Sequence, residues 1–186
     1  MGILAKTKSN VPSVILRKLY FTLLQPYLEY CNIVWATGTS VMLNKLLVVR
    51  IKVLRMITNS PWNTHAPPIF IKLGILTVFN INKLQTAFFM YMVMNNLVPS
   101  FFVKMFTVNS AIYNYDTLQK NNLLVPSYRT TVRKHSVSVC GVNMWNDIPE
   151  QVKEFKTCNQ FKLKYKRYCF VKTTLDTLHL KTVVCC

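Results

Sequence analysis

The chain has 186 residues and carries 23 Lys and Arg against 6 Asp and Glu, which gives a formal net charge of +17. Because 51% of the residues are hydrophobic, a fully disordered polyelectrolyte is excluded, and we expect one domain or two small ones that share a core. Six carboxylates leave little material for an active site built on paired carboxylates or on a carboxylate-bound metal.

The basic side chains fall mainly into two regions. Eight of the 23 lie in residues 1–60, four in residues 61–125 and eleven in residues 126–186, and the middle region is nearly uncharged and apolar. An excess this one-sided is typical of a surface that contacts nucleic acid or anionic lipid. Lys and Arg that only keep an apolar chain in solution are the alternative explanation.

The N-terminal third of the chain is predicted to be helical. Residues 1–13 are expected to be a leader, and residues 14–60 a helical region. Within this region the apolar segment 14–36 suits helices that break or bend near Pro26, since proline lacks the N–H that a helix interior needs. Residues 37–40 are predicted to form the turn that follows.

Residues 41–58 give the clearest helical pattern in the chain, and an Asn-Ser-Pro sequence ends it. At about 100° per residue, Lys45, Lys52 and Arg55 share one flank of this helix, whereas Arg50 falls off that flank. The sequence therefore predicts a partly buried helix with one basic edge.

Residues 61–106 are expected to be an apolar helical continuation. A Pro-containing link leads to a short helix at about 69–73, then to an extended link and a buried helix at about 80–94, and Pro99 opens a further turn. The uncharged run 84–103 is long enough to span a bilayer. Its Gln, Asn and Pro residues favour a buried helix that ends in a turn, so membrane insertion is not expected.

The last third of the chain is predicted to be a polar loop over residues 107–126 and a basic tail module over residues 127–172. Alternation of apolar and polar residues predicts a strand in 128–141. Short helical turns, a basic helix and a flexible tail are predicted over residues 141–156, 159–172 and 173–186. The predicted fold class is mostly α (α+β), a helical bundle followed by a small tail module with one or two short strands.

The basic helix predicted over residues 159–172 carries the strongest local signal for nucleic-acid binding. Its aromatic residues Phe161, Tyr165 and Tyr168 fall in one stripe. Four cations occupy the rest of its circumference, namely Lys162, Lys164, Lys166 and Arg167. Two interpretations of this helix are compatible. In one, the stripe packs on the body of the protein and the cations are solvated; in the other, the same cations contact phosphates.

The sequence holds no motif that carries a common catalytic chemistry. It has no H-E-x-x-H, G-x-S-x-G or Walker loop and no paired aspartates of a two-metal polymerase. Its six cysteines include no C-x-x-C pair and fit no zinc finger. We expect a binding or scaffolding chain with no catalytic residue, metal or cofactor. We also expect it inside the cell, in cytoplasm or nucleus, rather than secreted, because no signal peptide is recognisable.

Five motifs follow one another in a defined order along the chain. They are L-Y…Q-P-Y-L-E-Y-C-N-I-V-W at 19–35, the helix with Arg50 and Arg55 that ends in I-T-N at 57–59, Y-N-Y-D-T at 113–117, R-T…R-K at 129–134 followed by G-V-N-M-W-N-D-I-P at 141–149, and F-K-L-K at 161–164. Together they resemble the C-terminal thumb and post-thumb region of LINE-type (non-LTR) retrotransposon reverse transcriptases, the jockey-like group in particular. The resemblance covers about residues 14–170, and at Leu118 the family usually has Arg.

The resemblance implies a helical thumb-like region at residues 14–60 and a nucleic-acid-binding tail beyond it. In the intact enzymes the thumb holds the primer–template duplex, and Mg²⁺ is bound by a [YF]-x-D-D aspartate pair in the palm. This sequence contains no such pair, so the resemblance implies a non-catalytic fragment of an RNA-directed DNA polymerase that does not polymerise on its own. The expected partners are RNA or an RNA–DNA hybrid, and a full-length reverse transcriptase.

The resemblance, mapped onto the basic residues of this chain, gives the candidate phosphate contacts. On the thumb-like helix they are Lys45, Arg50, Lys52 and Arg55. In the tail they are Arg129, Arg133, Lys134, Lys162, Lys164, Lys166 and Arg167.

The sequence predicts different roles for its three tryptophans. Trp35 and Trp145 are expected to be core anchors, whereas Trp62 and His65 suit either a core or a binding role.

Two alternative functions are compatible with the sequence. One alternative function is a membrane-surface protein that uses the same cations together with lipidated Cys185-Cys186. The other is a non-functional retroelement remnant that exposes part of its apolar 69–106 surface.

Overall fold

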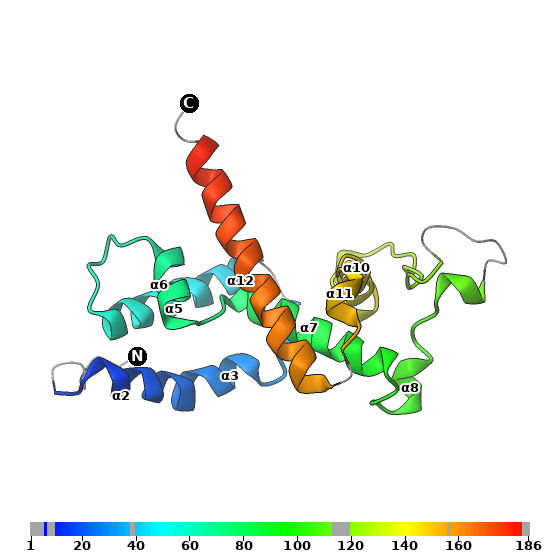
Figure 1. The fold of residues 1–186 in the computed structure, drawn as a ribbon, viewed down its shortest axis with the longest axis horizontal. Coiled ribbons are helices and arrows are strands. Elements are labelled where there is room, and N and C mark those ends of the chain that lie inside the picture. Colours follow the sequence, from blue (N-terminus) through cyan, green and yellow to red (C-terminus); the bar gives the residue numbers. More distant parts are fainter. Residues whose placement is uncertain (1–5, 7–9, 38–39, 113–119, 156, 184–186) are drawn as a thin grey trace. The chain divides into compact units, whose positions relative to one another are not determined.

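The computed structural model describes residues 6, 10–37, 40–112, 120–155 and 157–183, with backbone only at residues 40 and 173–183. Within these ranges all regular elements are helical, and the ribbon shows coils throughout (Figure 1). The β-structure in the described ranges is a single isolated antiparallel bridge between Val108 and Leu123. The prediction of a mostly helical chain is therefore confirmed, whereas the α+β assignment is wrong.

The chain divides into two compact units. The first consists of Met1–Asn82 together with Phe170–Cys186, and the second consists of Lys83–Cys169. Two helices, α7 (Val78–Met94) and α12 (Cys158–Val183), have residues in both units. The predicted basic helix at 159–172 therefore exists and continues beyond Lys172, through part of the segment predicted to be a flexible tail.

The first unit begins with a helical segment that Pro26 interrupts, as predicted. The segment comprises α2 (Ser13–Leu19), the π-turn η1 (Tyr20–Leu24), α3 (Gln25–Glu29) and α4 (Asn32–Trp35). Because proline has no N–H and its ring crowds the preceding turn, the helix widens just before it, and the N–H of Gln25 donates to the carbonyl of Tyr20 five residues back. A left-handed backbone at Cys31, with φ of 48°, then separates α3 from α4.

Three helices end in the same hydrogen-bonded motif. They are α5 (Ser40–Thr58), α6 (Ala66–Leu73) and α7, which are followed by Asn59, Gly74 and Asn96 in the left-handed conformation. After each of these residues the next N–H donates to a carbonyl five residues back, for example from Ser60 to Arg55 at 3.0 Å. Asn and Gly tolerate positive φ better than other residues, which is why the Asn-containing sequences after α5 and α7 correctly predicted the ends of these two helices.

The core of the first unit is formed where α2 and η1 pack against α5 and α6. Its buried apolar side chains include Tyr20, Leu54 and Phe70. The side-chain amide of Asn82 donates to the Oδ1 of buried Asn32 at 3.1 Å, and Asn32 in turn donates to the carbonyl of Leu28 at 2.8 Å. The buried side-chain amide of Asn32 is thus satisfied within the unit, whereas one guanidinium nitrogen each of Arg50 (Nη1) and Arg55 (Nε) is buried without a hydrogen-bond partner.

The second unit contains short helices built around α7 and the N-terminal part of α12. The short helices are α8 (Ser100–Val103), η2 (Asn109–Ala111), α9 (Thr131–Lys134), η3 (Val137–Gly141), α10 (Val142–Asn146) and α11 (Glu150–Lys153). The ring of Phe161 stacks on that of Tyr91 with centroids 4.4 Å apart, and Trp145 is buried beside it, as expected for a core anchor. The side-chain amide of Asn146 both accepts from the N–H of Leu123 and donates to its carbonyl, which fixes the loop segment before α9.

The strand predicted in residues 128–141 is replaced by α9 and η3. Thr130 caps α9 by accepting the N–H of Arg133, and the hydroxyl of Ser136 donates to the Arg133 carbonyl. The residues that are buried here, Val139 and Val142, are three apart, as on a helix, whereas Val132 is 85% exposed. Burial of one helical face therefore outweighs the local alternation, and the strand prediction is wrong.

Candidate nucleic-acid interface

The basic flank predicted on α5 consists of two exposed lysines and one tethered arginine. Lys45 and Lys52 are exposed and share their side of the helix with exposed Val48 and Val49. Arg55 is half-buried, and its Nη2 donates to the carbonyl of Thr64 at 2.6 Å. Lys45 and Lys52 are thus open to an anion, while Arg55 holds the loop that follows the helix.

Arg50 is buried and is removed from the candidate phosphate contacts. It is only 3% exposed; its Nε donates to the phenol oxygen of Tyr20 at 2.5 Å and its Nη2 donates to Gln25 at 3.3 Å. The guanidinium also lies 5.7 Å from the ring centroids of both Tyr20 and Phe70. Burial lowers the pKa of Arg50, and the Tyr20 hydroxyl partly offsets this effect. The assignment of Arg50 as a phosphate contact is therefore wrong, because the side chain stabilises the core.

The aromatic stripe of α12 packs inward, and its cations lie on two flanks. Phe161 and Tyr165 are buried, with ring centroids 5.8 Å apart. At about 100° per residue, Lys162 and Lys166 lie on one side of this buried stripe, and Lys164 and Arg167 lie on the other. All four are exposed except Lys166, which is half-buried.

Two of these lysines are positioned by aromatic rings. The Nζ of Lys162 lies 3.9 Å from the ring centroid of Phe88, and that of Lys164 lies 5.7 Å from the ring centroid of Phe155. Both side chains remain exposed, so the rings orient the ammonium groups without removing them from solvent.

The remaining tail candidates surround α9. Arg129 lies just before the helix, and Arg133 and Lys134 form its last turn, where cations interact favourably with the helix dipole. All three side chains are exposed. The second unit thus presents two groups of surface cations, one at α9 and one on α12.

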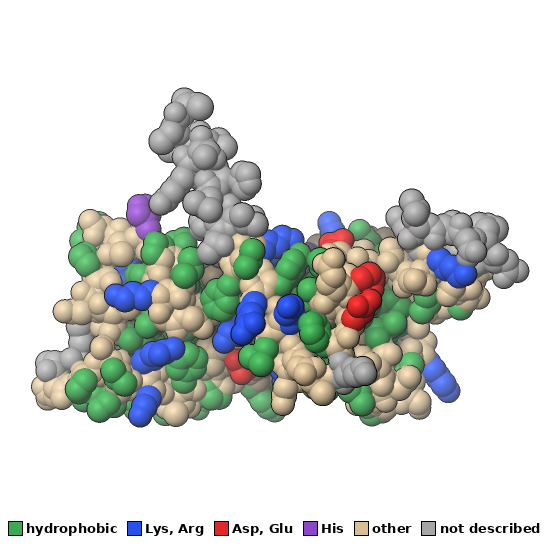
Figure 2. Space-filling view, in the orientation of Figure 1, with side chains coloured by type: hydrophobic (Ala, Val, Ile, Leu, Met, Phe, Trp, Pro, Cys, Tyr) green, Lys and Arg blue, Asp and Glu red, His purple; other side chains and the backbone are tan. Residues whose placement is uncertain are grey.

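The surviving candidate cations have no carboxylate partner. An ion pair joins Lys153 to Glu150 at 2.9 Å, and neither residue is a candidate. Figure 2 shows Lys and Arg side chains set among hydrophobic and neutral ones, with acidic side chains in few places. The ten candidates without an ion pair are Lys45, Lys52, Arg55, Arg129, Arg133, Lys134, Lys162, Lys164, Lys166 and Arg167.

Two other kinds of site are relevant among the described residues, a metal site and a membrane-spanning helix. The described residues include no cluster of three or more His, Cys, Asp or Glu side chains that could hold a metal ion. The described helices also include none with the length and apolar character needed to cross a membrane. The 113–117 motif, Leu118 and the Cys185-Cys186 pair lie outside the described residues.

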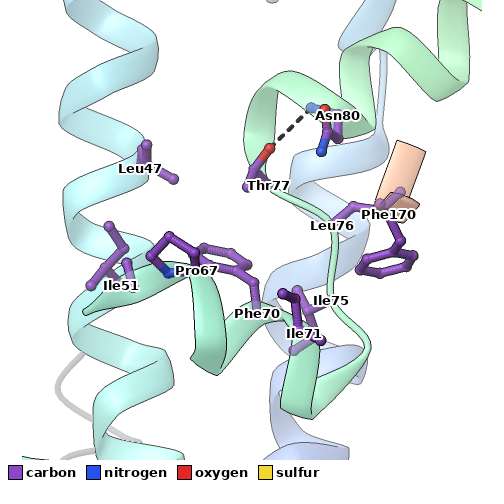
Figure 3. A pocket seen from close by; sticks show the side chains of 11 residues that line it. Leu47, Ile51, Pro67, Phe70, Ile71, Ile75, Leu76, Thr77, Asn80 and Phe170 are labelled. Carbon is purple, nitrogen blue, oxygen red and sulfur yellow. Dashed lines mark hydrogen bonds between the residues drawn. The ribbon is translucent and has the colours of Figure 1, made fainter. Parts of the chain in front are cut away.

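A pocket in the first unit is lined almost entirely by apolar side chains. Leu47 and Ile51 come from α5, Phe70 and Ile71 from α6, and Phe170 also borders the pocket (Figure 3). Its polar groups, on Thr77 and Asn80, are joined by a hydrogen bond from the Asn80 N–H to the Thr77 hydroxyl at 3.2 Å. No titratable side chain is among the residues that line the pocket.

Two buried tyrosines make the folding stability of the chain depend on pH. Burial raises the pKa of Tyr20 and, more strongly, that of Tyr165. In the unfolded chain these phenols lose their protons near pH 10. The folded chain then binds more protons than the unfolded chain, so its stability falls as pH rises above about 10.

We expect the unfolding temperature to fall between about pH 10 and 11, with up to about 1.4 kcal/mol lost per pH unit for each retained proton. Tyr165→Phe should make this fall shallower, because the variant has no phenol proton at this position. Tyr128→Phe, at an exposed tyrosine, is the matched control and should follow the parent chain. Thermal unfolding followed by circular dichroism across pH 8–11 measures the effect, and identical slopes for the parent chain and Tyr165→Phe would contradict it.

Comparison of the chain with protein-family models, with curated proteins and with solved structures gave no match. Sequence and structure therefore assign the chain to a structural class but to no protein family. The chain is an all-helical protein, in its described part, with an excess of surface cations that lack acidic partners.

Proposed function

We propose that this chain binds RNA or an RNA–DNA hybrid through phosphate contacts, as the non-catalytic C-terminal part of a retrotransposon reverse transcriptase. The observation that carries this proposal is the set of ten cations that have no carboxylate partner. A surface of mixed charge keeps a chain in solution equally well, so solubility alone does not require this excess of cations. Binding of a polyanion does require cations that no carboxylate neutralises.

The burial pattern supports recognition of phosphates over recognition of bases on α12. Phe161 and Tyr165 of this helix face the core, and Trp145 is buried as well, so none of these three rings is free to stack on a base. The exposed side chains of the helix include Lys162, Lys164 and Arg167, together with the apolar Leu163 and Val171. Contacts of this kind depend little on sequence.

Purified chain should bind RNA and RNA–DNA hybrid with an affinity that falls steeply as salt is raised. Each phosphate contact contributes about −0.7 to −0.9 to the slope of log affinity against log salt concentration. We expect a slope steeper than about −3, which corresponds to at least four contacts. Fluorescence anisotropy of labelled RNA and hybrid, measured from about 50 to 300 mM KCl, determines the slope. Binding that ignores salt, or no binding at the lowest salt, would show that the proposal is wrong.

The two alternative functions are outcomes of the same study. A membrane-surface protein would float with vesicles of anionic phospholipid and fail to shift labelled RNA. A remnant that does not fold alone would melt without cooperativity, in line with the exposed apolar residues Leu97, Phe101 and Met105 of the 69–106 segment.

A further inference from the structure

Trp62 is an exposed aromatic side chain on a tightly held turn. It is 85% exposed, whereas Trp145 is buried and Trp35 is half-buried with its indole N–H donated to the Tyr30 carbonyl at 2.8 Å. In the described residues, the Trp62 indole has no hydrogen-bond or ring partner. The fold thus leaves one of its largest apolar surfaces in water.

The turn that carries Trp62 is fixed at both ends. The N–H of Thr64 donates to the Pro61 carbonyl at 3.1 Å, so Trp62 lies inside a closed four-residue turn. Before the turn, the Thr58 and Ser60 hydroxyls are 2.8 Å apart. At the last residue of the turn, Arg55 donates to the Thr64 carbonyl at 2.6 Å. Because this backbone is already fixed, the Trp62 ring loses little conformational entropy when it binds a planar partner.

The neighbours of the ring favour a nucleobase over lipid. Residues 59–65 read N-S-P-W-N-T-H, so one large apolar side chain stands among amide, hydroxyl and imidazole groups that can hydrogen-bond to base edges. Binding to a lipid surface strengthens with the apolar area that is buried, and residues 59–65 offer no second large apolar side chain. Residues 1–82 contain one carboxylate, Glu29.

We propose that Trp62 is a stacking platform for an unpaired base of a single-stranded nucleic acid. This proposal rests on the proposed function and refines it, because phosphate contacts alone do not distinguish single strands from duplexes. The bases of a duplex are stacked on their neighbours, whereas an unpaired base can be splayed out onto a ring, so the first unit should prefer a single-stranded segment.

The test compares the parent chain with Trp62→Ala and Trp62→Phe on a ten-nucleotide oligouridine and on a blunt RNA–DNA hybrid. Trp62→Ala should bind oligouridine about tenfold more weakly, whereas Trp62→Phe should retain most of the affinity. Both variants should bind the hybrid within about twofold of the parent chain and with the same salt slope. Oligouridine should also quench the tryptophan fluorescence of the parent chain more than that of Trp62→Ala.

The outcomes separate this proposal from the proposed function. Equal affinities of parent chain and Trp62→Ala for oligouridine, with the salt slope intact, would overturn base stacking and leave phosphate binding in place. Failure of the parent chain to bind either nucleic acid would overturn both. A Trp62-dependent shift of emission with phosphatidylserine vesicles but not with oligouridine would assign the ring to a lipid surface instead. Unchanged melting temperatures of both variants would show that the affinities compare folded proteins.

Discussion

Neutralising Lys164 and Arg167 together should weaken RNA binding by about 30-fold near 0.1 M salt and reduce the salt slope by about 1.4. Both side chains are exposed and lie on the same flank of α12, so one phosphate chain can follow both of them. Lys162 and Lys166 lie on the opposite flank of the helix, and Lys166 is half-buried. A double Lys162→Gln, Lys166→Gln variant makes the same charge change on the same helix and is the matched control.

Titrations of labelled RNA at several salt concentrations measure both variants. We expect the control pair to change affinity by less than about threefold, because its charges are turned away from the strand that Lys164 and Arg167 follow. Equal losses for both pairs would mean that binding depends on overall charge and not on one flank. Unchanged binding for both would exclude α12 from the interface and leave the cations of α9 and α5 as candidates.

Phe161→Ala should destabilise the second unit by about 3–5 kcal/mol, the cost of removing a large aromatic ring from a packed core. Phe161 is fully buried and stacks on Tyr91 at 4.4 Å, and it also neighbours Tyr165 and Trp145. The cavity left by the ring would lie in the core of the second unit, where α7, α10 and α12 meet. Loss of its contacts should loosen the part of α12 that carries the cations.

Urea denaturation followed by circular dichroism measures this loss. Leu163→Ala is the matched control, because Leu163 lies two residues further along the same helix and is 61% exposed, and we expect it to cost less than about 1 kcal/mol. Similar denaturation midpoints for Phe161→Ala and the parent chain would mean that the ring is not a core residue.

The sequence by itself predicted the helices whose signals are local. The ends of α5 and α7 follow from Asn residues that adopt positive φ, and the break near Pro26 follows from the missing N–H. The stripe of Phe161 and Tyr165 follows from helical spacing, because residues four apart face the same way on any helix. These features depend on residues within one or two turns of each other, which is why they could be inferred without the fold.

Tertiary packing decided what local patterns leave open. Periodicity placed Arg50 off the basic flank of α5, but its burial depends on Tyr20, thirty residues away, and on Phe70. Alternation in residues 128–141 suggested a strand, yet burial of Val139 and Val142 in the core of the second unit favours helical turns. Whether a cation reaches solvent, and whether Trp62 or Trp145 is the exposed ring, is set by partners distant in sequence, because apolar burial is a property of the assembled core and not of any one segment.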